Sequence, residues 1–126
     1  MNNVQFFIQQ ESRRYEQLCE SALRQVRQAL SMLEVKRAMH VPKPSVLRGI
    51  HLPKVGIVRE LELAAERRMT ALLDEQLKHA AGIADLDARK TYLGQLQSQD
   101  WIALRGDFPA LCRKADIEGQ RLLAEA

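Results

Sequence analysis

Residues 55–81 read VGIVRELELAAERRMTALLDEQLKHAA, and this stretch decides the fold class. Apolar and small side chains recur in it every three or four residues, which is the period of a helix with one buried face. We expect a helix over about 55–81, with Gly82 as its C-terminal cap. Its inward side is predicted to carry Val58, Leu61, Ala65, Met69, Leu72, Leu73, Leu77 and Ala80.

A second periodic stretch precedes it, over about residues 3–39. Its apolar or small residues follow the spacing of a heptad seam, with one full heptad first and then steps of four and three, at Ile8, Tyr15, Cys19, Ala22, Val26, Ala29 and Leu33. Leucines beside the seam widen the stripe, which favours a bundle over a two-stranded coiled coil. A single helix of this length would span about 50 Å at ~1.5 Å per residue, more than a compact domain of this size is wide. We therefore expect part of it to contact a second copy, as in a homodimer.

The remaining sequence predicts one irregular connection and several shorter helices. Prolines and a glycine interrupt residues 40–54, where neither a helical nor a strand period is visible. Beyond Gly82, capping residues and short apolar runs predict two or three shorter helices over about 85–126. The expected fold is a single all-α domain, residues 1–126. It is a helical bundle built on a long N-terminal helix and a second, antiparallel long helix.

Composition and the chain ends indicate where such a protein would work. With 126 residues the chain can bury one core without a metal or a disulfide. Cys19 and Cys112 both fall in helical stretches, where an intracellular protein normally keeps them reduced, and a disulfide is possible but not required. The first residues carry no basic segment ahead of an apolar run, and no stretch reaches the ~20 apolar residues of a membrane span. We expect a cytoplasmic protein that does not enter a membrane.

Charge is distributed unevenly along the sequence. Residues 1–60 carry a net charge of +5 and residues 61–126 a net charge of −2. The segment 35–59 holds no Asp or Glu at all, so we expect it to attract an anionic partner. Its candidate contact residues, for a partner or for phosphates, are Lys36, Arg37, Lys43, Arg48, His51, Lys54 and Arg59.

The usual motifs of catalysis and cofactor binding are missing from the sequence. The six glycines are isolated, so no phosphate-binding loop is present, and no GxSxG, HExxH or CxxC pattern occurs. Cys19, His40, His51 and Cys112 lack the spacing of a zinc site, and the pair Glu62 and Glu66 is typical of a solvated helix face. We expect no enzyme, no cofactor and no metal site.

Two functions remain compatible with these features. The first is a non-enzymatic helical interaction module, such as an adaptor, regulator or inhibitor. It would bind a protein with an acidic surface through the long first helix and the basic segment 35–59. The alternative is a nucleic-acid-binding protein that uses the same cations on phosphates, although the segment lacks the aromatic residues that stack on bases.

Overall fold

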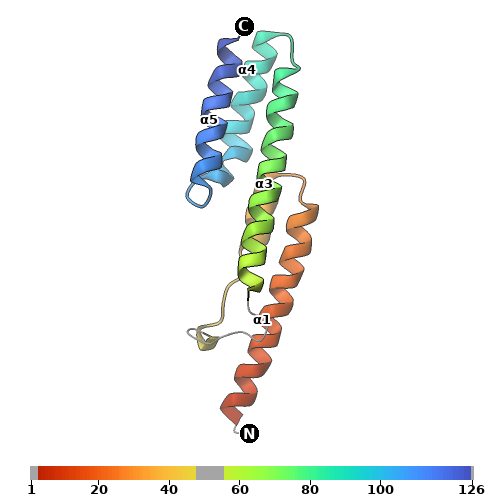
Figure 1. The fold of residues 1–126 in the computed structure, drawn as a ribbon, viewed down its shortest axis with the longest axis vertical. Coiled ribbons are helices and arrows are strands. Elements are labelled where there is room, and N and C mark those ends of the chain that lie inside the picture. The colour runs from red at the N-terminus through yellow and green to blue at the C-terminus, as the bar shows by residue number, and fades with distance from the viewer. Residues whose placement is uncertain (1–2, 48–55, 126) are drawn as a thin grey trace.

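The computed structural model describes residues 3–47 and 56–125, and every regular element in these ranges is helical (Figure 1). The elements are the α-helices α1 (Asn3–Gln28), α2 (Met32–Met39), α3 (Ile57–Ala81), α4 (Leu86–Gln95) and α5 (Pro109–Ala124), the 3-10 helices η1 (Ser45–Leu47) and η3 (Trp101–Leu104), and the π-helical turn η2 (Leu96–Asp100). The predicted all-α bundle is confirmed. None of the described helices is both long and apolar enough to cross a membrane.

The expected single helix over residues 3–39 is wrong, because the chain breaks between α1 and α2. The Ser31 hydroxyl caps α2 by accepting the N–H of Glu34 at 3.2 Å, and the Glu34 carboxylate accepts the N–H of Leu30 at 2.7 Å. The first bond satisfies a backbone donor that a helix start leaves without a partner, and the second ties down the residue just before the cap. The chain turns back there, and α2 packs against both α1 and α3 (Figure 1). The length argument for a homodimer therefore no longer holds.

The two long helices run in the same direction, so the expected antiparallel arrangement is also wrong. Tyr15 of α1 shares a buried cluster with Ile57 at the start of α3. Further along, Arg27 lies 3.7 Å from Glu60, and Arg68 donates to the carbonyl of Ala29 at 2.8 Å. Residue numbers thus rise together along both helices. The short α2 is the return element that makes this parallel arrangement compatible with the chain's connectivity (Figure 1).

The main core lies where the C-terminal half of α1, α2 and α3 meet the C-terminal helices. Most residues predicted on the inward side of α3 are buried there, whereas Val58 remains 38% exposed.

A network of polar side chains connects α2, α3 and the η2–η3 segment. The Asp100 carboxylate accepts the N–H groups of Met32 and Leu33 at 3.3 and 3.2 Å and the Gln76 amide at 2.7 Å. The Gln76 oxygen in turn accepts the indole N–H of Trp101 at 2.8 Å, so η2 and η3 hold the start of α2 in place.

Arg89 fastens the opposite end of the bundle. Its guanidinium donates to the backbone carbonyls of Ala81, Ile83 and Leu122, with a shortest distance of 2.8 Å to Ile83. Such carbonyls at helix ends have no partner within their own helix. One side chain of α4 thereby joins the end of α3 to the end of α5.

Candidate partner-binding groove

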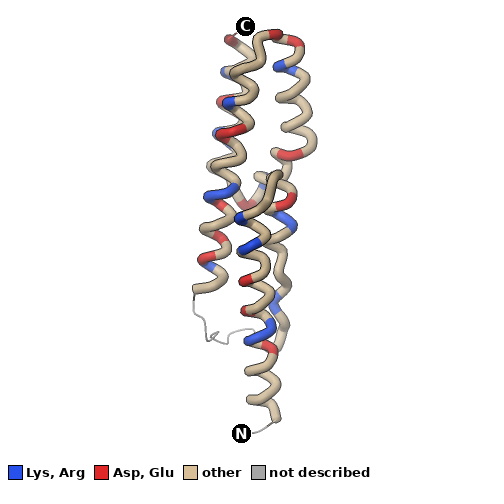
Figure 2. Tube along the Cα trace, turned by 90° about the vertical axis from the view of Figure 1, so that its right-hand side faces the viewer, with Lys and Arg blue, Asp and Glu red and all other residues tan. Residues whose placement is uncertain are grey.

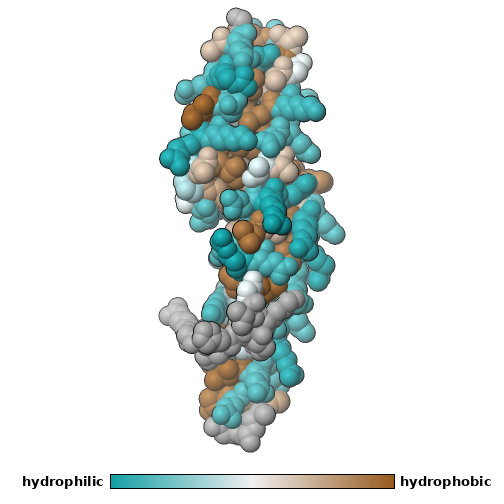
Figure 3. Space-filling model, in the orientation of Figure 1, coloured by the Kyte–Doolittle hydropathy of each residue, from teal (hydrophilic) through white to brown (hydrophobic). Residues whose placement is uncertain are grey.

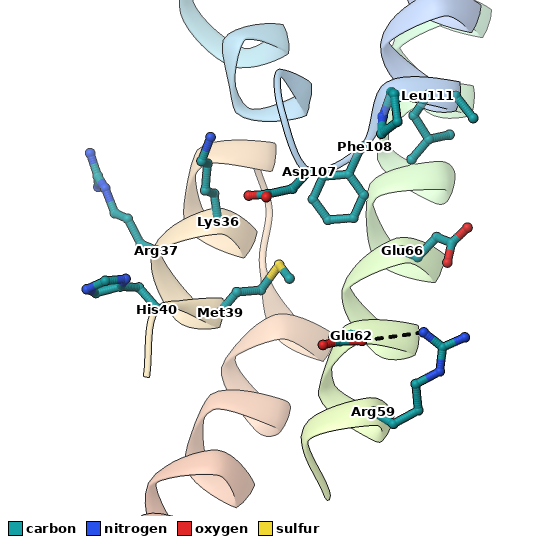
Figure 4. A pocket seen from close by; sticks show the side chains of 12 residues that line it. Lys36, Arg37, Met39, His40, Arg59, Glu62, Glu66, Asp107, Phe108 and Leu111 are labelled. Atoms are coloured by element: carbon teal, nitrogen blue, oxygen red, sulfur yellow. Dashed lines mark hydrogen bonds and ion pairs between the residues drawn. The ribbon is translucent and has the colours of Figure 1, made fainter. Parts of the chain in front are cut away.

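A groove of about 850 Å³ lies between α2 and α3, beneath the turn that leads into α5 (Figure 4). We name it the α2–α3 groove, and it is lined by Lys36, Arg37, Met39, His40, Arg59, Glu62, Glu66, Asp107, Phe108, Pro109, Ala110 and Leu111. It draws residues from three parts of the chain that are far apart in sequence.

Local sequence features place each wall of the groove. The bonds from Asp100 hold the start of α2, so the last turn of this short helix presents Met39 toward α3 (Figure 4). At the end of the groove, Gly106 adopts φ +86°, a conformation that residues with a Cβ rarely take. Pro109 then occupies the first turn of α5, where its missing N–H costs no hydrogen bond. The result is a tight turn that buries Phe108 against the core.

The groove has an apolar lining that remains partly accessible. Met39 and Leu111 are partly buried and pack against the core, and Phe108 is 9% exposed. Figure 3 shows apolar atoms at mid-height on one face of the molecule, between hydrophilic side chains. An apolar lining with a few charged groups at the edges is the usual composition of a binding site.

Both signs of charge border the groove, although the sequence segment 35–59 contains no acid. Lys36 comes from α2, whereas Glu62 and Glu66 come from α3 and Asp107 from the turn before α5. Arg59 already pairs with Glu62, at 3.4 Å between the guanidinium and the carboxylate. Figure 2 shows Lys and Arg interspersed with Asp and Glu along the helices. The groove therefore has no large excess of positive charge.

The structure brings together only some of the predicted contact residues. Lys36, Arg37 and Arg59 line the groove, but Arg37 projects away from α3 (Figure 4). Lys43 is exposed and lies outside the groove. The predicted residues Arg48, His51 and Lys54 lie outside the described residues.

Sequence reasoning missed the groove's apolar residues and its carboxylates. In the sequence Met39 is simply the last residue of the expected long helix. Asp107 and Phe108 indicate the start of a helix and give no sign of a binding site. The sequence does place Glu62 and Glu66 as a pair on one helix face. Nothing in a single sequence shows that these carboxylates line a groove with Met39 and Phe108.

Tyr15 and Cys19, the two buried titratable groups of α1, both stay protonated at neutral pH. Burial raises the pKa of Tyr15 to about 12, and its hydrogen bond with Cys19 acts in the same direction. Burial also raises the pKa of the Cys19 thiol, which keeps it protonated and poorly nucleophilic at neutral pH. No group of three or more His, Cys, Asp and Glu side chains in residues 3–47 and 56–125 is arranged to hold a metal ion.

Comparison with protein-family models, with curated proteins and with solved structures found no match to this chain.

Proposed function

We propose that this protein is a non-enzymatic interaction module, an adaptor, regulator or inhibitor, that binds an amphipathic helix of a partner protein in the α2–α3 groove. The observation that carries the proposal is the combination of an apolar lining, formed by Met39, Phe108 and Leu111, with charged groups of both signs at its edges. An amphipathic helix laid into an apolar groove is a recurrent mode of protein recognition.

The charges define the chemistry of the partner helix. Lys36 has no ion pair among the described residues, and neither does Glu66 or Asp107, so these groups remain available to a ligand. A partner with acidic residues along one flank would meet Lys36, and basic residues along the other flank would meet Glu66. Such pairs at the edge of an interface set orientation and specificity more than affinity. The apolar stripe between the two flanks supplies most of the contact.

Nucleic acid is the alternative ligand for the same cations. The carboxylates of Glu62, Glu66 and Asp107 would lie close to a phosphate backbone bound along the groove, which is unfavourable for a polyanion. The sequence-based expectation that Lys43, Arg48 and Lys54 contribute to binding either ligand stays a prediction. The cytoplasmic location expected from the sequence also stays a prediction.

Fluorescence anisotropy with defined probes separates the two functions. The first probe is a helical peptide of about 18 residues, with a leucine stripe flanked by Glu on one side and Lys on the other. The others are random-sequence single-stranded and duplex DNA and RNA, each tested at about 50 and 200 mM salt. We expect the peptide to bind and the nucleic acids not to compete for it. Nucleic-acid binding that falls steeply with salt and disappears when Lys43, Arg48 and Lys54 are all changed to Glu would establish the alternative.

Matched variants connect peptide binding to the groove. Met39→Gln places a polar group in the apolar lining, and we expect it to weaken peptide binding about tenfold, since a buried apolar contact contributes more than 1 kcal/mol. Lys36→Glu should lower the affinity for a peptide with acidic flanks and raise the affinity for a peptide with basic flanks. The control is Lys90→Glu on α4, whose side chain is exposed and lies outside the groove. Equal affinity for all three variants would refute the assignment of the groove.

A further inference from the structure

The N-terminal half of α1 exposes large apolar side chains that no other described element covers. Phe7 is 51% exposed and Leu18 is 46% exposed. Figure 1 shows the first turns of α1 projecting beyond η1, and Figure 3 shows apolar atoms at this end of the molecule. The buried residues Tyr15 and Cys19 occupy a different side of the helix, so Phe7 and Leu18 are not part of the chain's own core.

Phe7 and Leu18 belong to one stripe with two charged residues between them. Positions 7, 11, 14 and 18 are spaced four, three and four apart, and at 3.6 residues per turn they fall within about 60° of one another. Glu11 and Arg14 occupy the two middle positions. Neither makes an ion pair or a side-chain hydrogen bond within residues 3–47 and 56–125.

The stripe is symmetric about its midpoint, between residues 12 and 13. A two-fold axis at this point, perpendicular to α1, places Phe7 level with Leu18 of a second copy. The same axis places Glu11 level with Arg14 of the second copy, and Arg14 level with its Glu11. Every position therefore meets a residue of complementary chemistry, as an isologous interface requires.

We propose that a second copy of this chain covers the stripe, with the two α1 helices packed antiparallel through Phe7, Glu11, Arg14 and Leu18. Two apolar contacts flank two ion pairs along the seam, and the charges fix the register of the helices, as charged positions do in coiled coils. A parallel pair would set Glu11 against Glu11 and Arg14 against Arg14, which is repulsive.

The shape of the molecule favours the antiparallel arrangement. One side of α1 packs against other elements from about Ile8 onward, whereas its first residues project freely (Figure 1). In an antiparallel pair the N-terminal parts of the two α1 helices overlap through the exposed stripe, and the two helical bodies lie at opposite ends. None of the four stripe residues lines the α2–α3 groove, so this inference is independent of the proposed function.

The test is the mass of the full chain in sedimentation equilibrium, over a concentration range from about 1 to 100 μM. Wild type should show twice the 14.4 kDa chain mass. Glu11→Arg and Arg14→Glu should each weaken dimerisation about tenfold, because the two-fold symmetry turns both ion pairs of the interface into repulsive pairs. The double variant Glu11→Arg/Arg14→Glu restores both ion pairs and should restore the dimer. Circular dichroism verifies that each variant keeps its helix content.

Arg13→Glu is the matched control, since Arg13 is exposed and lies on the opposite side of α1 from the stripe. It should dimerise as the wild type does. A wild-type monomer throughout the concentration range would overturn the proposal. A dimer that ignores the single reversals, or that the double variant does not recover, would also overturn it, because its interface would then lie elsewhere.

Discussion

Replacing Asp100 by alanine should destabilise the protein more than any other single change to a carboxylate. The carboxylate accepts two N–H groups from the first turn of α2 and one from the Gln76 amide. Loss of a helix N-terminal acceptor costs about 1 kcal/mol, and loss of a charge-assisted hydrogen bond costs about 2 kcal/mol. The expected loss of unfolding free energy is therefore about 3 kcal/mol, or a fall in Tm of about 10 °C for a domain of this size.

Urea unfolding, monitored by the helical circular dichroism signal, measures this loss. It does not depend on the fluorescence of Trp101, whose surroundings change when its neighbour Asp100 is replaced. Asp100→Asn keeps one acceptor oxygen, which at the position of Oδ2 can still accept from Met32 and Gln76, but it loses the negative charge and the bond from Leu33, so about half of the loss is expected. Asp116→Ala is the control, because Asp116 is an exposed acid on α5. A loss below about 1 kcal/mol for Asp100→Ala, no greater than that for the control, would refute the role of Asp100 as the anchor of α2.

Three further predictions concern single positions. Gly94→Ala should stabilise the protein by about 0.7 kcal/mol in urea unfolding, since a Cβ there meets nothing within 4 Å and Gly is a poor helix former. Arg89→Met should cost about 2 kcal/mol by leaving the carbonyls of Ala81, Ile83 and Leu122 without a donor, and Lys90→Met next to it should cost almost nothing. Tyr15 should make stability fall with rising pH, because the unfolded chain loses the phenol proton near pH 10 and the folded chain only near pH 12. Its contribution is thus complete below pH 10 and lost by pH 12, roughly 3 kcal/mol in all. Tyr15→Phe should remove this part of the fall in stability when unfolding is measured across that pH range.

The helical periods predicted the elements well where local pattern and burial agree. The helix expected over 55–81 forms as Ile57–Ala81, and the connection at residues 40–44 is irregular, as its prolines indicate. The break between α1 and α2 was missed because the seam residues Val26, Ala29 and Leu33 continue the heptad spacing across it. The signal was present in Ser31 and Glu34, which form the capping bonds.

The candidate site depends on contacts that one sequence does not reveal. Segment 35–59 has no acid, yet Glu62, Glu66 and Asp107 line the same groove as Lys36. Their positions follow from the return of α2 and from the turn at Gly106, both of which depend on tertiary contacts. The parallel course of α1 and α3 depends on the same break in the chain. Charge counted along the sequence therefore overstated the basic character of this surface.

The most direct test of the proposed function is a photo-cross-link from the mixed-charge helical peptide. A benzophenone in its leucine stripe reacts with the side chains that it contacts, and mass spectrometry maps the attachment sites. We predict cross-links at Met39, Phe108 or Leu111, which an excess of unlabelled peptide prevents and random-sequence nucleic acid does not. Cross-links confined to other surfaces, or none at a peptide concentration that saturates binding, would contradict the assignment of the α2–α3 groove as the partner-binding site.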